Sequence, residues 1–143
     1  MKTYLGYIKE LPDNGIFVFG SNTQGRHGKG SALIALQKFG ALYGQARGKQ
    51  GRSYAIVTKD LTKKEHPSIQ KSYIMEQIID LYKYAWACPK LDFYVAYQGN
   101  GKNLNGYTPQ EMAKIFASAH LSMPIPENII FEINFYHLIK QYL

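Results

Sequence analysis

Two stretches of the chain combine glycine with polar side chains that can bind or transform a ligand. The first, 20-GSNTQGRHGKGS-31, holds the amide of Asn22 and the imidazole of His27 among four glycines. The second, 98-QGNGKNLNGY-107, has a similar composition. Glycine has no Cβ and tolerates positive φ, so such loops can bring backbone N–H groups close to a phosphate. We therefore interpret both stretches as parts of one ligand site.

Asn22 and His27 are the candidate catalytic residues. An asparagine amide can hydrogen-bond a sugar hydroxyl, and an imidazole can transfer a proton near neutral pH. The alternative for His27 is a structural contact with the backbone of its own loop. The other three histidines lack metal-ligand spacing, and the one cysteine, Cys88, allows no intramolecular disulfide and no zinc pattern. We expect no metal, no cofactor and an unreactive Cys88.

The segments around these stretches alternate between strand and helix patterns. Short apolar runs predict strands at 15–20, 53–58, 91–97 and 128–133. Helical periodicity predicts helices at 31–39, 68–87, 109–120 (with Thr108 as N-cap, Pro109 at N1 and Glu111 at N3) and in the last ten residues. We expect loops at 45–52 and 59–67, and one or two edge strands within residues 1–11.

This alternation predicts a single α/β domain over residues 1–143 with a largely parallel sheet. Each glycine-rich stretch follows a strand and precedes a helix. In an open parallel sheet that place is the carboxyl edge, where ligands bind. Two such loops on neighbouring strands can hold a diphosphate between backbone N–H groups and a helix N-terminus.

Composition narrows the class of protein. Hydrophobic residues make up 45% and charged residues 19%, which is typical of a globular chain. No apolar run approaches the roughly 18 residues of a membrane span, and residues 1–13 lack the apolar segment of a signal peptide. We expect a cytoplasmic protein with no membrane association.

The net charge leaves two kinds of partner open. A formal charge of +7 favours an anion such as a nucleotide or a nucleic acid. The lysines are spread along the chain, which makes nucleic acid the weaker candidate. The twelve tyrosines can stack on bases or pack in the core, and we favour packing. The common nucleotide motifs are not met, because Lys29 precedes Gly30 and because Leu33 follows where GxGxxG requires glycine.

Four segments of the chain resemble the macrodomains, an α/β family that binds ADP-ribose. Val18–Asn22 is similar to the family's strand end V-N-A-A-N, and His27–Leu33 resembles its loop H-G-G-G-V-A-G-A-L. Ser53–Thr58 is similar to K-Y-V-I-H-T, and Gly106–Pro109 resembles G-Y-P with one inserted threonine. The resemblance covers nearly the whole chain in order, as in a divergent bacterial or phage-type member.

The resemblance implies a three-layer fold with a central, mostly parallel mixed sheet flanked by helices. It implies binding of ADP-ribose, a related nucleotide or an ADP-ribosylated protein. It leaves open whether the chain only binds or also acts as an ADP-ribosyl hydrolase or an ADP-ribose 1″-phosphate phosphatase through Asn22 and His27. The ligand-binding residues that it implies are Gly20, Ser21, Asn22, Gly28, Lys29, Gly30, Ser31, Gly99, Asn100, Gly101, Gly106 and Tyr107.

Three features depart from or add to this pattern. Tyr7 stands where the family has the acid that reads the adenine amine, and Lys29 stands where many members have glycine. A T-K-D block at 58–60, similar to that of other small proteins with a G-S-N-x-x-G-R-H-G-x-G stretch, adds Lys59 and Asp60 to the predicted site. The alternative for Asp60 is a cap or turn residue. The competing hypothesis for the whole chain is a non-catalytic nucleic-acid-binding or regulatory protein that uses its basic surface.

Overall fold

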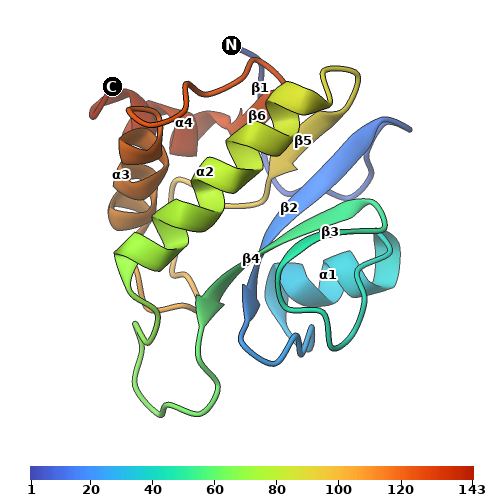
Figure 1. The fold of residues 1–143 in the computed structure, drawn as a ribbon, viewed down its shortest axis with the longest axis vertical. Coiled ribbons are helices and arrows are strands. Elements are labelled where there is room, and N and C mark those ends of the chain that lie inside the picture. Colours follow the sequence, from blue (N-terminus) through green and yellow to red (C-terminus); the bar gives the residue numbers. More distant parts are fainter.

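The computed structural model describes residues 1–143 as a six-stranded sheet with helices on both faces (Figure 1). The strands are β1 (Thr3–Tyr4), β2 (Gly15–Asn22), β3 (Gly48–Gln50), β4 (Ser53–Lys59), β5 (Asp92–Val95) and β6 (Ile129–Glu132). The helices are α1 (Gly30–Lys38), α2 (Lys71–Ala87), α3 (Pro109–Ala119) and α4 (Ile133–Lys140). The prediction of an α/β fold with a mostly parallel mixed sheet is confirmed.

The strand order is β1-β6-β5-β2-β4-β3, and every neighbouring pair is parallel except β3 with β4. The chain passes from β2 through α1 and β3 to β4 on one side of β2. Helix α2 then carries it back to β5 on the other side of β2. The direction of winding therefore reverses between β2 and β5, and such a switch point leaves a crevice at the carboxyl ends of the two strands.

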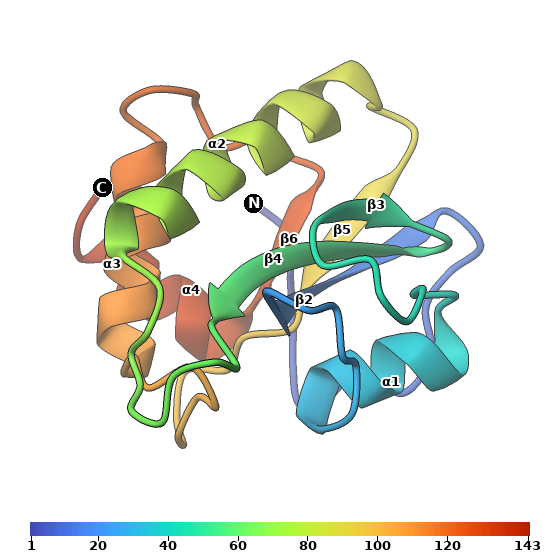
Figure 2. The same cartoon turned by 60° about the horizontal axis from the view of Figure 1, so that its bottom comes forward.

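Side chains of the central strand alternate between two cores, which explains the three layers. Ile16 and Val18 join the larger core with α2, α3 and α4, whereas Phe17 and Phe19 pack against α1 in a smaller core. Figure 2 shows α1 on one face of the sheet and α2 on the opposite face. A strand that is apolar on both faces reads as a continuous hydrophobic run, as residues 16–19 do.

The predicted start of α3 is confirmed in detail. The Thr108 hydroxyl accepts a hydrogen bond from Glu111 N at 3.1 Å, and the Glu111 carboxylate accepts one from Thr108 N at 3.0 Å. Pro109 occupies the first helical position, where its missing N–H costs nothing. Two orphan N–H groups at this helix end are thus satisfied by local residues.

The predicted loop at 45–52 is wrong for residues 48–50. Gly48–Gln50 form the antiparallel edge strand β3, which pairs with the first residues of β4 through a tight turn at Gly51. This strand contains no apolar residue, so alternation of hydrophobicity gave no signal. Pairing with β4 alone defines it.

Several predicted boundaries also differ from the observed ones. Helix α2 starts at Lys71 rather than at residue 68, because its N-cap Gln70 has an extended backbone. The strand predicted at 91–97 is β5 at 92–95, and the strand predicted at 128–133 ends at Glu132, where α4 begins directly. Residues 1–11 contain one strand of two residues.

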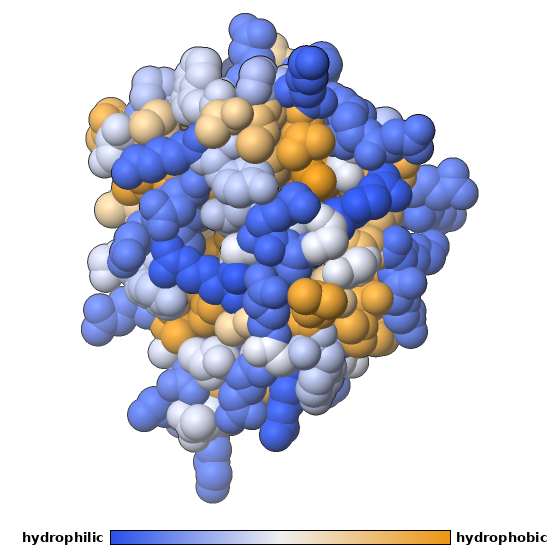
Figure 3. Space-filling view, turned by 45° about the vertical axis from the view of Figure 1, so that its right-hand side comes forward, coloured by the Kyte–Doolittle hydropathy of each residue, from blue (hydrophilic) through white to orange (hydrophobic).

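No helix has both the length and the apolar character needed to cross a membrane. On the face shown in Figure 3, hydrophilic side chains predominate, and hydrophobic ones gather in a few patches among them.

Candidate functional site

A cleft lies at the carboxyl edge of the sheet, at the switch point between β2 and β5. It consists of two adjoining cavities of about 360 Å³ and about 260 Å³. We call the larger cavity the aromatic lobe, after Tyr7, Phe17 and Tyr97 in its wall, and the smaller one the basic lobe, after Arg26, Lys29 and Lys59. Both lobes are lined by Gly20, Lys29, Thr58, Leu104 and Asn105. A single ligand can therefore occupy both.

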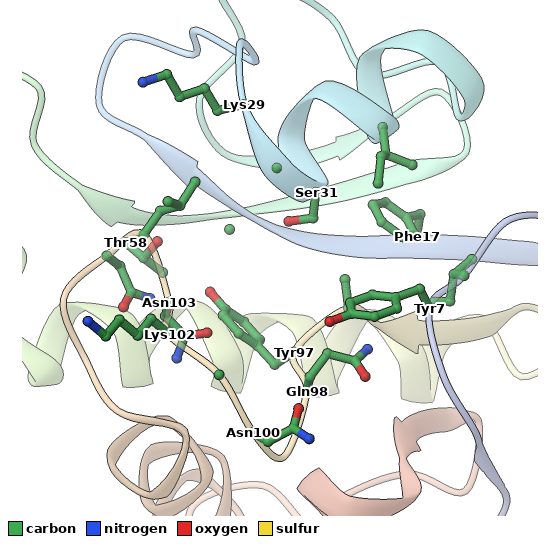
Figure 4. A pocket seen from close by; sticks show the side chains of 18 of the residues that line it. Tyr7, Phe17, Lys29, Ser31, Thr58, Tyr97, Gln98, Asn100, Lys102 and Asn103 are labelled. Carbon is green, nitrogen blue, oxygen red and sulfur yellow. The ribbon is translucent and has the colours of Figure 1, made fainter.

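The aromatic lobe offers flat apolar surface and one free amide oxygen. Tyr7, which is 78% exposed, stands near Phe17 at one end of the cavity (Figure 4). The Gln98 amide donates to Gly6 O at 3.3 Å and to the Tyr4 hydroxyl at 3.4 Å. Its own oxygen accepts no hydrogen bond from the protein, so it can accept one from a planar ligand group.

The charge of the cleft is uniformly positive. Arg26 and Lys59 line the basic lobe, Lys102 lines the aromatic lobe, and Lys29 lines both. No aspartate or glutamate lines either cavity. A concave surface with cations and without carboxylates concentrates anions, and this attraction falls with ionic strength.

The N-terminus of α1 adds backbone donors to this positive field. Its N-cap Lys29 makes no side-chain capping bond, and the first turn holds no acidic residue. Gly30 has a φ of +58°, a conformation that strongly favours glycine, and both Gly30 and Ser31 line the aromatic lobe. Unpaired N–H groups in the first turn of a helix, together with the helix dipole, bind anions.

The floor of the cleft is polar and buried. Tyr97, only 8% exposed, extends its hydroxyl to Gly20, where an added Cβ would lie 2.8 Å from the Tyr97 Oη and 3.2 Å from the Thr58 Oγ1. The Tyr97 hydroxyl makes no hydrogen bond of normal length and angle within the protein; the polar side chains that lie near it are those of Thr58 and Asn105. Burial raises the pKa of Tyr97 to about 12, so the phenol keeps its proton at neutral pH.

Asn22 lines the basic lobe, but its amide mainly builds the first loop. Its Oδ1 accepts from Arg26 N at 3.0 Å and Gln24 N at 3.2 Å, and its Nδ2 donates to Arg26 O at 2.7 Å. These bonds curl residues 22–26 into a compact turn. One amide hydrogen of Asn22 remains for a ligand.

The structure places His27 outside the cleft. Its ring is fully buried, edge-on to Phe19, with Nε2 3.1 Å from the Gln50 Oε1. The same oxygen accepts from Leu42 N at 2.8 Å, and an amide oxygen cannot donate, so the His27 Nε2 carries the proton. His27 thereby ties the first loop to β3.

Three of the predicted residues in the second loop anchor it instead of lining the cleft. Gly99 N donates to the Glu132 carboxylate at 2.8 Å, and a Cβ on Gly99 would lie 2.5 Å from the backbone of Asn134. A Cβ on Gly106 would lie 2.5 Å from the His66 carbonyl carbon. The Tyr107 hydroxyl donates to Ile69 O at 2.6 Å. These contacts fix both ends of the loop.

Asp60 also lies outside the cleft. Its carboxylate accepts from the Thr62 hydroxyl at 2.6 Å and from Thr62 N at 2.9 Å, and these hydrogen bonds lower the pKa of Asp60. The geometry is that of a turn. The predicted residues that do line the two cavities are Gly20, Ser21, Asn22, Gly28, Lys29, Gly30, Ser31, Lys59, Asn100 and Gly101.

Sequence reasoning missed residues at the ends of β4 and β5 and two residues of the second loop. Tyr97 and Thr58 follow the ends of β5 and β4 or close them, and Asn105 and Lys102 belong to the second loop. Polar side chains at the places where two apolar runs end were the available signal for these residues.

No family model and no curated protein matches the chain. No group of three or more histidine, cysteine, aspartate or glutamate side chains is placed to hold a metal ion. The fold and the site thus define an α/β protein with a basic cleft at the switch point of its sheet.

Proposed function

We propose that the cleft binds ADP-ribose or a related nucleotide. The observation that carries the proposal is a cleft with four cationic side chains and no carboxylate, set between two glycine-rich loops at a sheet switch point. The sequence resemblance to macrodomains supports the same ligand class, because it is strongest in the two loops that contribute to this cleft.

Successive parts of the cleft correspond to successive parts of such a ligand. The nucleobase lies in the aromatic lobe against Tyr7, where the Gln98 oxygen accepts a hydrogen bond from an amino group. The diphosphate lies between the N-terminus of α1 and Asn100–Gly101. The distal ribose lies in the basic lobe near Asn22. Lys29, which contacts both lobes, neutralises the diphosphate.

We propose ligand binding as the main function and hydrolysis of the ligand only as a further activity. No aspartate, glutamate, histidine or cysteine lines either cavity, so the lining offers no carboxylate, imidazole or thiol as a general base. Of the two predicted catalytic residues, Asn22 is in position to orient a water molecule, and His27 acts only through the loop conformation. Incubation with ADP-ribosylated protein and with ADP-ribose 1″-phosphate tests for the two hydrolytic activities.

Calorimetric titration with ADP-ribose tests the binding, with ADP, AMP and NAD as comparators. We expect saturable binding that prefers ADP-ribose, and a loss of about tenfold in affinity for Lys29→Ala and for Lys102→Ala, since each removes a charged contact to phosphate. Lys83→Ala is the matched control, because Lys83 is exposed on α2 on the opposite face of the sheet from α1. Equal losses in all three variants, or no binding, would contradict the proposal.

A second candidate is binding of single-stranded nucleic acid, favoured by the same cationic cleft and by the exposed ring of Tyr7 at its mouth. Salt dependence and competition separate the two functions. Binding of an oligonucleotide that weakens steeply with salt and is not displaced by ADP-ribose would support this candidate.

A further inference from the structure

We propose that Tyr97 is a ligand-binding residue whose buried hydroxyl donates a hydrogen bond to an oxyanion of the bound ligand, at the point where the two lobes meet. The inference rests on the proposed function in that it uses the same cleft. It adds one residue, Tyr97, one atom, its hydroxyl oxygen, and the ligand group that this atom contacts, a phosphate oxygen.

The first argument is the missing partner of this hydroxyl. Buried polar groups in folded proteins nearly always have hydrogen-bond partners, and an exception calls for an explanation. The fully buried Tyr82 follows the rule, because its hydroxyl donates to Phe116 O at 2.8 Å. The Tyr97 hydroxyl makes no hydrogen bond of normal length and angle, and only the Thr58 and Asn105 side chains lie near it. An acceptor supplied by a ligand accounts for the exception.

The second argument is the direction of the hydroxyl. The ring of Tyr97 packs against Phe116 and Phe135, with centroid separations of 5.9 Å in both cases, so the ring is held in place. Figure 4 shows the hydroxyls of Tyr97 and Ser31 both pointing toward the space between the two loops. Ser31 lies in the first turn of α1, so its neighbouring N–H groups face the same region.

The third argument is the space made by Gly20. The backbone of Gly20 does not need a positive φ, yet any side chain there would collide with the Tyr97 oxygen at 2.8 Å. A glycine on a central strand costs stability, because it packs no side chain. At this position, which lines both lobes, it makes room for the Tyr97 hydroxyl.

The fourth argument decides which group is the donor. The charged neighbours of this floor are cations, and the α1 N-terminus presents N–H donors, so the field favours a negatively charged ligand atom. Because the phenol is protonated and cannot lose its proton near neutral pH, it meets such an atom as a donor. The nearby cations and N–H donors favour a phosphate oxygen as this acceptor.

The test compares Tyr97→Phe with Tyr82→Phe, each of which removes one buried oxygen. For Tyr97→Phe we expect about tenfold weaker binding of ADP-ribose and of inorganic pyrophosphate, with a melting temperature equal to or above that of the wild type. For Tyr82→Phe we expect a lower melting temperature and unchanged affinity. A purely structural Tyr97 would give a lower melting temperature without a specific loss of affinity, and this result would overturn the inference.

A size-compensation experiment checks the geometry. Gly20→Ala should lower both stability and affinity, because its Cβ meets the Tyr97 oxygen. In the double variant Gly20→Ala/Tyr97→Phe, the ring carbon that carried the oxygen lies 3.6 Å from the new Cβ, which is ordinary contact. We expect the double variant to regain stability relative to Gly20→Ala without regaining affinity. Additive losses of stability would contradict the placement of the hydroxyl at Gly20.

Two probes distinguish failure of this inference from failure of the proposed function. If the wild type binds ADP-ribose and Tyr97→Phe binds it equally well, the inference is wrong and the proposed function stands. If pyrophosphate binding depends on Tyr97 but ADP-ribose does not bind, the inference stands and the proposed function is wrong. If neither probe binds the wild type, both are wrong.

Discussion

Replacement of Asn22 by alanine tests how the first glycine-rich loop is held in shape. The Asn22 amide makes three hydrogen bonds of 2.7–3.2 Å to the backbone of Gln24 and Arg26. Alanine makes none of them, and Asn22 is only 7% exposed, so water replaces them incompletely. The loop that carries Arg26, Gly28 and Lys29 should then sample other conformations.

The magnitude follows from the number of bonds. A net value of about 1 kcal/mol for each hydrogen bond, reduced for partial access of water, gives a loss of about 2 kcal/mol in the free energy of unfolding. An unfolding entropy of about 2.1 cal/mol/K per residue over 143 residues converts this into a drop of about 7 °C in melting temperature. Affinity for ADP-ribose should fall by at least about tenfold, because Lys29 loses its fixed position.

Calorimetry measures both effects, thermal unfolding for stability and titration for binding. Asn22→Asp is the matched comparison, since it keeps the oxygen that accepts from Gln24 N and Arg26 N but replaces the donor to Arg26 O by an acceptor. Its new negative charge in the basic lobe should still weaken anion binding. A melting temperature of Asn22→Ala within about 2 °C of the wild type would refute the reasoning, because three bonds of this kind cannot be lost at so small a cost.

Three further outcomes follow from contacts around the cleft. Glu132→Ala removes the N-cap of α4 and the acceptor for Gly99 N, and should cost about 3 kcal/mol in urea unfolding, whereas Glu132→Gln should cost less because it keeps one acceptor oxygen. Leu104→Ala should speed ligand dissociation in stopped-flow experiments with little change in stability, since Leu104 borders both lobes and is 59% exposed; an unchanged rate would show that this side chain does not retain the ligand. Burial raises the pKa values of Tyr54 and Tyr97 from 10.0 to about 12, so the unfolded chain releases these protons at a lower pH than the folded chain. The free energy of unfolding should therefore fall as pH rises from about 10 to about 12. A urea midpoint that stays constant over that range would contradict this.

The element types were largely predictable because they depend on local periodicity. The apolar, β-branched run at 53–58 favoured a buried strand, and Thr108, Pro109 and Glu111 marked the start of a helix within four residues. The strand β3 was not predictable, because Gly48–Gln50 are polar and become a strand only by pairing with β4.

The site was predictable in place but only partly in composition. A glycine-rich stretch between strand and helix belongs at the carboxyl edge, and ten of the predicted residues line the cleft there. The role of His27 was not predictable, because its partner Gln50 lies 23 residues away on the unpredicted strand. The role of Tyr97 required the knowledge that Gly20 faces it from the adjacent strand.

The sequence by itself determined the alternation of strands and helices, the positive charge and the two loops rich in glycine. Tertiary structure decided that β5 returns to lie beside β2, which brings the two loops to opposite sides of one cleft. It also decided which loop residues face the cleft and which anchor the loops. The physical reason is that element type follows from neighbours along the chain, whereas strand order and side-chain direction follow from burying faces of segments that are distant in sequence.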